Sequence, residues 1–405
     1  MPAFHEIPPT AGFPLYLKDY LALFSRQARS SCLEEDFKDY LGTPFTRITY
    51  SGTAAFYFIL ETLKKLSPRK TVVIPSFICP LVPLAIKRAG LKIAVCDTRS
   101  DNFNFDINAL EKNCTDNKDL LAIVATHLGG IPLEIETIKR VAEKNNIFII
   151  EDCAQSLGAR YKGKLTGTIG DFSFFSLCRG KGLTIYEGGV LTAKKELYCK
   201  EIDDIITQFS GVNIPSETLK ILELFGYGIF YRPCLFWFAY RLPQIYWEAR
   251  KEPLKALAEY FDTDFDTHRV SKLRKNIGHI TFARLEEEIK KQRQKAAMYI
   301  EGLQGSGIKV ISEAPGDYAT YPYLTLIFPE EELRRKAIKT FRDSGLGVSQ
   351  IYAHAICDYD YLGELTGNAA CPNARSLAKT HITLSTSTFM TNKDIDRVIN
   401  TIRKL

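Results

Sequence analysis

The sequence predicts an α/β protein with a doubly wound, mostly parallel sheet, because strand-like and helix-like patterns alternate between residues 50 and 193. Four short apolar runs have the character of strands that are buried on both faces: residues 71–74 (TVVI), 92–95 (KIAV), 120–125 (LLAIVA) and 147–150 (IFII). An amphipathic helical pattern at residues 135–145 separates the last two runs. Ligands of such sheets bind at the carboxyl ends of the strands, so the residues after each run are the first candidates for a site.

The pattern changes after residue 200, and a chain of 405 residues is long enough for more than one domain. A helical pattern at 280–303, a strand-like run at 323–328 and a second helical pattern at 393–403 predict a smaller C-terminal α+β domain. We therefore expect a large α/β domain at residues 1–200, a helical, aromatic-rich insertion at 201–270 and a small domain at 271–405.

Residues 221–247 form a block that is dense in aromatic side chains and interrupted by Pro233 and Pro243. Charged residues divide the block into apolar runs that are too short to span a membrane. The block predicts a helical subdomain or a subunit interface. The alternative is a peripheral contact with a membrane surface or with a lipid substrate.

The composition, with 45% hydrophobic and 25% charged residues, is typical of a soluble globular protein. The net charge of +6 is spread along the chain and gives no indication of nucleic-acid binding. Ten cysteines without a C-x-x-C pair indicate free thiols in a reducing compartment, and the first residues lack the pattern of a signal peptide. We expect a cytoplasmic protein.

Two carboxylates, Glu151 and Asp152, follow the apolar run at 147–150. A carboxylate at the end of a buried strand can form a strong, charge-assisted bond to a protonated ring nitrogen, and Asp152 is the candidate. Gln155, three residues later, is a candidate donor to a neighbouring ring oxygen. The alternative is an ordinary helix N-cap.

Lys181 lies between Gly180 and Gly182, just after the strand-like run FSFFSL at 172–177. A lysine amine in this position can form an imine, although a solvated loop lysine is the simpler interpretation of this motif alone. Ser176, five residues earlier, is placed to reach the phosphate of a ligand whose aldehyde the lysine would hold.

Ser51, Gly52, Thr53 and Ala54 begin a helical pattern after a short strand-like stretch. The exposed amides of a helix start and a threonine hydroxyl form a suitable phosphate site, while a plain helix cap is the common alternative. An enzyme that uses pyridoxal 5'-phosphate (PLP) needs a lysine amine, an acid at the pyridine nitrogen and a phosphate site. The three motifs together supply these groups.

In their order and spacing these motifs resemble the DegT/StrS-type nucleotide-sugar aminotransferases, PLP-dependent enzymes with the aspartate-aminotransferase fold. The resemblance extends over most of the chain, through LEEDFKDYLG (33–42), SGTAA (51–55), IPSFICP (74–80), THLGG (126–130), EDCAQSLGA (151–159), GDFSFFSLCRGKG (170–182), EGGVL (187–191) and CPNARSLAKTHITL (371–384). It implies a Schiff base on Lys181, Asp152 at the pyridinium nitrogen and Gln155 beside the phenolate oxygen. It also implies phosphate contacts from Gly52, Thr53, Ala54 and Ser176, and a homodimer with shared active sites.

Two departures from the family pattern concern the cofactor and the substrate. Where many members place an aromatic ring over the cofactor, this chain has Cys79, so Phe77 or another side chain must cover the ring, or the pocket is more open. Where members usually show Asn-x-Arg-Met, contributed across the dimer, this chain reads Asn276-Ile277-Gly278-His279-Ile280. Asn276 remains a candidate for the phosphate contact, but the arginine is absent.

Two histidines are candidates for substrate contacts. His127 follows the apolar run at 120–125 and matches a family position, with a satisfied structural histidine as the alternative. His354 lies in a late loop where the family often places substrate residues. No pattern for a zinc site, a G-x-G-x-x-G fingerprint or a P-loop is present.

The resemblance implies transfer of an amino group from an amino acid, expected to be glutamate, to a keto sugar that is expected to be nucleotide-linked. A PLP-dependent sugar dehydratase is a second interpretation, but relatives of that type replace the lysine with histidine, which Lys181 argues against. A third interpretation is a catalytically idle or regulatory PLP-binding member that docks on a membrane through residues 221–247. The residue at position 79 and the absent arginine support this third interpretation.

Overall fold

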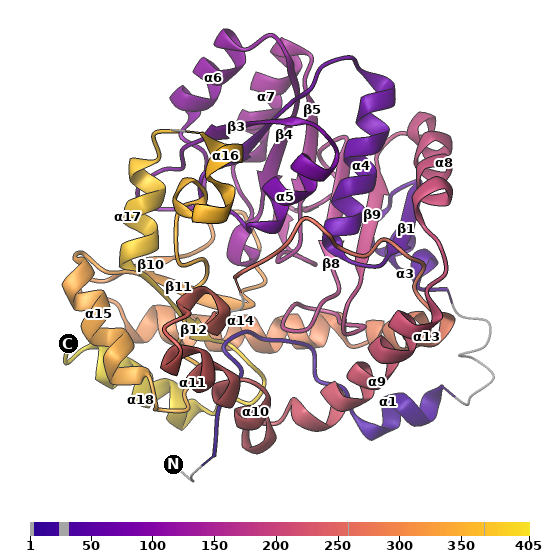
Figure 1. The fold of residues 1–405 in the computed structure, drawn as a ribbon. Coiled ribbons are helices and arrows are strands. Elements are labelled where there is room, and N and C mark those ends of the chain that lie inside the picture. Colours follow the sequence, from indigo (N-terminus) through magenta and orange to yellow (C-terminus); the bar gives the residue numbers. More distant parts are fainter. Residues whose placement is uncertain (1–3, 24–31, 258, 368) are drawn as a thin grey trace.

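The computed structural model describes residues 4–23, 32–257, 259–367 and 369–405. A seven-stranded sheet forms its centre, with the strand order β1-β9-β8-β5-β4-β2-β3 (Figure 1). The strands are β1 (Phe45–Thr49), β2 (Thr71–Pro75), β3 (Lys92–Cys96), β4 (Leu120–Thr126), β5 (Phe148–Asp152), β8 (Phe172–Ser176) and β9 (Gly189–Ala193). β9 runs antiparallel to both of its neighbours, and the strands from β8 to β3 are parallel. The predicted mostly parallel α/β sheet is confirmed.

Helices cover both faces of this sheet, as the continuous apolar strands predict. Val72 and Ile74 of β2 belong to one core with α4 (Gly52–Leu66), α5 (Leu81–Arg88) and α8 (Cys199–Phe209). Val73, between them, belongs to a second core with α6 (Ile107–Asp116) and α7 (Ile135–Asn145). A third core joins the β8–β9 end of the sheet to α3 (Leu33–Leu41) and to α14 (Leu285–Gly302).

The C-terminal part forms the predicted small α+β domain. Its antiparallel sheet has the order β10 (Lys309–Ile311), β11 (Tyr323–Ile327) and β12 (His381–Ser385). Side chains of α14, α15 (Glu331–Phe341) and α18 (Asn392–Ile402) share its hydrophobic core, and Ile7 from the N-terminal segment lies in the same core. The same half also contains the helices α13 (Lys272–Phe282), α16 (Gly363–Thr366) and α17 (Pro372–Thr380). A short hairpin of β6 (Arg160–Tyr161) and β7 (Lys164–Leu165) forms a separate two-stranded sheet.

The aromatic block is helical and lies at the lower edge of the molecule in Figure 1. Residues 221–247 lie in α9 (Ile214–Phe230), α10 (Pro233–Ala239) and α11 (Arg241–Ala249), and the short α12 (Pro253–Ala256) follows them. The N-terminal segment and α1 (Leu17–Ala22) pack on α9, where the hydroxyls of Tyr227 and Tyr231 donate hydrogen bonds to the carbonyls of Phe13 and Thr10. Arg241 of α11 pairs with Asp343 beside α15, so the block contacts both the N-terminal segment and the small domain.

The division at residues 1–200, 201–270 and 271–405 stays a prediction. Ile202 and Ile205 of α8 lie in the core of the large sheet, and Ile7 lies in the core of the small domain, so side chains cross two of these boundaries. Among the described helices, none combines the length and the apolar character that crossing a membrane requires.

Candidate active site

Lys181 stands at the tip of a loop that follows β8. Backbone bonds from Leu177 to Gly188 and from Arg179 to Tyr186 close the base of this loop, and Gly180 adopts a φ of +77°, a conformation that favours glycine. Within the described part of the chain, the Lys181 amine forms no hydrogen bond and no ion pair. Its positive charge acts on the carboxyl of Asp152 and on the thiol of Cys79. The amine is therefore held near the strand ends without a protein partner.

Asp152 is the last residue of β5, in the middle of the sheet, and only 5% of it is exposed. Burial raises the pKa of its carboxyl, while the amide of Ala154 and the charge of Lys181 oppose the rise. Oδ1 accepts a hydrogen bond of 3.0 Å from the Ala154 amide. The two carboxylates are the last two residues of the strand, as the sequence predicts, and turns rather than a helix follow.

The start of α4 and Ser176 lie next to each other. A Cβ built on Gly52 would lie 3.3 Å from the Cβ of Ser176, so the two segments are in van der Waals range. The Ser51 hydroxyl caps the helix by accepting a hydrogen bond from the Ala54 amide at 3.1 Å. Among described residues, the amides of Gly52 and Thr53 have no acceptor. These two amides, beside the Ser176 hydroxyl, form a helix N-terminus suited to a phosphate, whereas the Ala54 amide is engaged in the cap.

Gln155 is held in one orientation by two donors. Its Oε1 accepts hydrogen bonds from the Gly129 amide at 2.9 Å and from the Tyr323 hydroxyl. Its Nε2 points to the hydroxyl of Tyr352, 3.4 Å away. Because the carbonyl end is occupied, the amide end faces the site, which is the orientation that donation to a ring oxygen requires.

Tyr352 is a site residue that no sequence motif marks. It has a φ of +46°, which is strained for a tyrosine, and strain of this kind concentrates at functional sites. Cys79, Tyr323 and Asp152 are all close enough to act on its hydroxyl, whose pKa burial raises well above the usual range. Phe77 is only 2% exposed and stacks on Phe103 with ring centroids 5.9 Å apart. Its ring also lies 5.5 Å from the Tyr352 ring, so Phe77 packs in a core behind Tyr352, an aromatic residue that faces the site.

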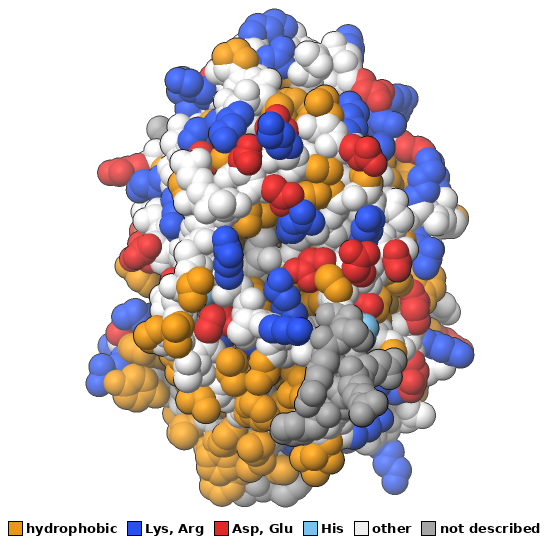
Figure 2. All heavy atoms as spheres, turned by 90° about the vertical axis from the view of Figure 1, so that its right-hand side faces the viewer, with side chains coloured by type: hydrophobic (Ala, Val, Ile, Leu, Met, Phe, Trp, Pro, Cys, Tyr) orange, Lys and Arg blue, Asp and Glu red, His pale blue; other side chains and the backbone are white. Residues whose placement is uncertain are grey.

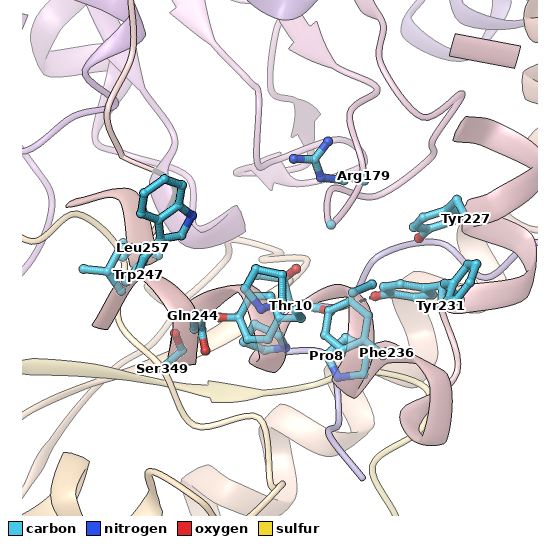
Figure 3. A pocket seen from close by; sticks show the side chains of 18 of the residues that line it. Pro8, Thr10, Arg179, Tyr227, Tyr231, Phe236, Gln244, Trp247, Leu257 and Ser349 are labelled. Atoms are coloured by element: carbon cyan, nitrogen blue, oxygen red, sulfur yellow. Dashed lines mark hydrogen bonds between the residues drawn. The ribbon is translucent and has the colours of Figure 1, made fainter. Parts of the chain in front are cut away.

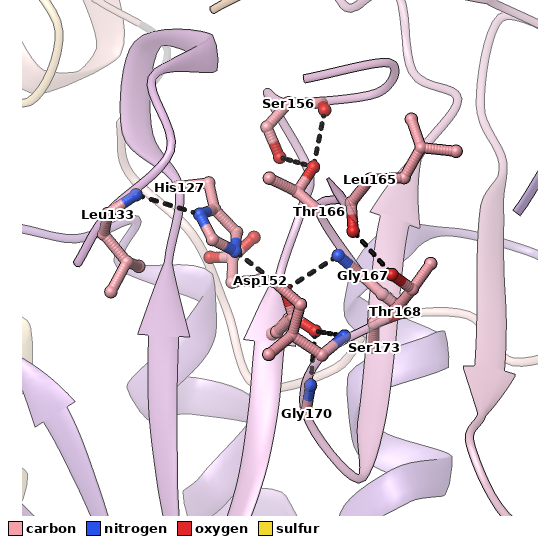
Figure 4. A network of polar contacts seen from close by, with 12 residues as sticks. His127, Leu133, Asp152, Ser156, Leu165, Thr166, Gly167, Thr168, Gly170 and Ser173 are labelled. Atoms are coloured by element: carbon pink, nitrogen blue, oxygen red, sulfur yellow. Dashed lines mark hydrogen bonds and ion pairs between the residues drawn. The ribbon is translucent and has the colours of Figure 1, made fainter. Parts of the chain in front are cut away.

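His127 and Glu151 form a buried network beside Asp152 (Figure 4). The Leu133 amide donates to Nδ1 of His127, so Nε2 carries the proton and donates to Glu151 at 3.0 Å. Both ring nitrogens are occupied, which favours the structural alternative for His127. Together with Cys153 these two side chains have the spacing of a metal site, but the histidine and carboxylate are already engaged and burial keeps the Cys153 thiol protonated.

Two further residues that the sequence predicts for the site are His354 and Asn276. His354 is exposed, with its ring edge against Tyr359. Asn276 lies on α13, two residues after Arg274. Arg274 is fully buried, pairs with Glu217 of α9 and donates to the carbonyl of Glu187 in the segment after Lys181. Arg274 thus fixes the end of the lysine loop, and no local sequence signal marks this contact.

This fold and these strand-end groups define a PLP-dependent transferase, and the residues present fit the cofactor. The unpartnered amine of Lys181, the buried carboxylate of Asp152 and the open amides of the α4 start would hold its aldehyde, ring nitrogen and phosphate. More specifically, the chain belongs to the DegT/DnrJ/EryC1/StrS aminotransferase family, whose model matches residues 23–227 and 266–403. It is a PLP-dependent enzyme of the aminotransferase type.

Two curated relatives are similar to this chain at 33% and 23% identity. A GDP-perosamine synthase of Escherichia coli O157:H7 is 33% identical over 196 residues, which cover 48% of this chain and 52% of that enzyme. A GDP-perosamine synthase of Vibrio cholerae is 23% identical over 374 residues, 91% of this chain and 89% of that enzyme. The match to the E. coli enzyme therefore spans about half of that enzyme's length, and the match to the V. cholerae enzyme spans most of it.

Solved structures confirm the fold over nearly the whole chain. The PMP form of the putative sugar aminotransferase Spr1654 from Streptococcus pneumoniae superposes with a TM-score of 0.77 at 20% identity, covering 99% of this chain and 97% of that chain. Helicobacter pylori PseC, an aminotransferase of pseudoaminic acid biosynthesis, gives a TM-score of 0.76 at 15% identity, covering 98% of both chains.

Proposed function

We propose that this chain transfers an amino group from an amino acid, with glutamate as the expected donor, to the carbonyl carbon of a nucleotide-linked keto sugar. The donor leaves as its 2-oxo acid, and the sugar carbonyl becomes an amine. The observation that carries the proposal is the position of the Lys181 amine, near the buried carboxylate of Asp152 and without a protein partner of its own.

Each role follows from a position in the structure. PLP, when bound, supplies an aldehyde that exchanges amino groups and a ring that withdraws electrons. Lys181 would hold that aldehyde and, once released from it, move the proton at the reacting carbon, a role worth roughly 10² to 10⁴ in rate. Asp152 would keep the ring nitrogen protonated, since its carboxylate is buried where a charge-assisted bond is strong. Gln155 would donate its Nε2 hydrogen to the ring oxygen.

The expected amino donor and keto-sugar acceptor, and the homodimer with shared active sites, follow from the family. His127 and His354 stay predictions as substrate residues, as does Asn276 as a phosphate contact. The cytoplasmic location and a peripheral membrane contact through residues 221–247 also stay predictions. Exposed apolar side chains on α9 and α11 support that contact.

The test is spectroscopic. Protein purified with PLP should absorb visible light, and glutamate should bleach that absorption. A Lys181→Ala variant should be colourless with an unchanged circular dichroism spectrum, and Lys164→Ala, at an exposed lysine, should behave as wild type. An enzyme loaded with pyridoxamine phosphate and separated from the 2-oxo acid product should then regain its colour when a keto-sugar acceptor is added. Colour without any exchange of amino groups would favour the idle, regulatory member instead.

A further inference from the structure

A cavity of about 720 Å³ opens beside the lysine loop (Figure 3). Arg179 and Gly180 form one side, the N-terminal segment with Thr10 forms another, and α9 to α12 form the largest part of the wall. Ile351, next to Tyr352, also lines it. Its volume lies within the roughly 300–1,000 Å³ that is usual for pockets that enclose a small organic ligand.

The aromatic block contributes two short helices to the cavity wall. Phe236 of α10 and Pro243 and Trp247 of α11 line the cavity, and Tyr240 lines it between the two helices. Tyr227 of α9 and Tyr231, just after α9, face the cavity from the side. This wall is therefore mostly aromatic and apolar, whereas the rest of the lining includes uncharged polar side chains: Thr10, Gln244, Ser349, Gln350 and Thr383.

This wall lies outside the part of the chain that the family pattern describes. The family model matches residues 23–227 and 266–403, so residues 228–265, with α10, α11 and α12, are unmatched. Thr10 lies before the first matched residue. The shared family pattern therefore does not account for this part of the cavity wall.

The charges that line the cavity are few and mostly paired. Glu223 bonds to Lys220 at 2.9 Å, and Lys255 pairs with Glu252 while its ammonium lies 4.9 Å from the centre of the Trp247 ring. Arg179 is the third charged lining residue, and its guanidinium contacts the Tyr186 hydroxyl. A diphosphate needs several charge-assisted donors, which these side chains do not provide. The cavity favours an uncharged, apolar occupant.

The outer faces of the same helices are apolar too. Leu222, Phe225 and Ile229 of α9 and Leu242 and Ile245 of α11 are exposed, whereas the α9 charges Glu217 and Lys220 point inward to paired positions. Figure 2 shows hydrophobic side chains gathered at the lower end of the molecule, at the level of α1 and α9 in Figure 1. Apolar patches of this kind mark sites that meet apolar partners.

We propose that the cavity binds a hydrocarbon chain attached to the acceptor sugar, so that the acceptor carries an apolar group in addition to the carbonyl that reacts near Lys181. The role as acceptor rests on the proposed transamination, but binding of the chain does not require it. The chain lies between the aromatic face of α10–α11 and α9, and the sugar extends past Gly180 toward the lysine.

The test uses the fluorescence of the PLP-loaded enzyme. The chain has two tryptophans, and Trp247 lines the cavity whereas Trp237 packs against Phe4 and Phe238. In a Trp237→Phe variant, octyl glucoside below its micelle-forming concentration should change the Trp247 emission saturably, and glucose should not. GDP and UDP should leave the emission unchanged. A response to GDP or UDP, without one to octyl glucoside, would show a nucleotide site and overturn the proposal.

Gly226 allows the cavity to be filled without moving its walls. It lines the cavity, and a Cβ built on it meets no heavy atom within 4 Å. Leucine in place of a helical glycine also favours the helix by up to about 1 kcal/mol, so the variant should fold. Gly226→Leu, in the Trp237→Phe background, should weaken octyl glucoside binding at least tenfold and leave the cofactor absorption unchanged.

Gly363→Leu is the matched control. Gly363 is exposed at the start of α16, outside the cavity, and a Cβ built on it also meets no heavy atom within 4 Å. Equal octyl glucoside binding in the two glycine variants would place the chain outside the cavity and end the proposal. Bleaching by glutamate reports the proposed transamination separately. A holoenzyme that bleaches normally but binds no octyl glucoside refutes the chain-binding cavity alone.

Discussion

The Nε2 atom of His127 lies 3.0 Å from the carboxylate of Glu151, and both side chains are completely buried. Three further donors converge on the same carboxylate: the amides of Gly167, Ile169 and Gly170, at 2.6 to 2.8 Å. This network joins β4, β5 and the turn before β8, directly beside Asp152. It supports the strand ends that carry the candidate active site.

Glu151→Gln should destabilise the protein by about 1–3 kcal/mol, because the amide nitrogen of glutamine cannot accept the hydrogen bonds that the Ile169 and Gly170 amides donate to Glu151, and buried donors are left unsatisfied. Burial tends to raise the pKa of Glu151, but His127 and the backbone amides outweigh it and hold the pKa below its usual value of 4.5. The contribution of the Glu151 carboxylate to stability is therefore complete above about pH 4.5 and decreases as the pH falls below it.

Urea unfolding at several pH values measures both the loss of stability in Glu151→Gln and its dependence on pH. Glu143→Gln, at an exposed pair, is the control, and equal stability of the two variants would contradict the prediction.

Gly189→Ala should disturb the phosphate site. A Cβ on Gly189 would lie 2.6 Å from the amide nitrogen of Gly52 and would overlap the carbonyl of Ser51, so the start of α4 must shift. Overpacking of this kind costs about 1–3 kcal/mol. Thermal unfolding should show that loss, and titration of the visible absorption should show weaker retention of PLP. Gly211→Ala, where a Cβ meets open space, should match wild type in both measurements.

Tyr323→Phe should alter the cofactor spectrum, because it removes one of the two donors that fix the Gln155 amide. A hydrogen bond contributes about 0.5–1.5 kcal/mol, so PLP affinity should fall by up to about tenfold. The visible absorption maximum should shift as the amide reorients. Tyr299→Phe is the control, because the Tyr299 hydroxyl is buried without a partner among the described residues, and its spectrum should not change. An unaltered Tyr323→Phe spectrum would argue against a contact between Gln155 and the ring oxygen.

His381 should make stability depend on pH. Burial, assisted by the charge of Arg334, lowers the pKa of His381 from 6.5 to about 4. Its Nδ1 donates to the Leu377 carbonyl, and its Nε2 accepts from the Ile351 amide, next to Tyr352. The unfolded chain therefore binds the proton more readily, and about 3 kcal/mol of stability should be lost as the pH falls from about 6.5 to about 4.

His381→Gln removes this titration, so its stability should change less over the same pH range, whatever its absolute stability. Denaturant unfolding of both proteins between pH 4 and pH 7 provides the comparison. Parallel stability curves would show that His381 does not titrate in this window.

The sequence alone determined the sheet, the small C-terminal domain and the groups at the strand ends. Apolar runs, helical periods and glycine-flanked loops are local patterns, and Lys181, Asp152 and the helix start at Ser51 each lie within one of them. Parallel strands bring their carboxyl ends to the same edge, so these local features predict a common site. The helical pattern at residues 135–145, for example, corresponds to α7, which spans Ile135–Asn145.

Only the tertiary structure decided which side chains complete the site. Tyr352 faces Gln155 across 197 positions of sequence, and Arg274 reaches Glu217 across 57. The aromatic wall forms a cavity only because the lysine loop, with Arg179 and Gly180, lies opposite it. Such contacts depend on how separate elements pack, and no pattern within one segment encodes them. Local chemistry therefore predicted the reacting groups, and long-range packing set their orientation and the cavity beside them.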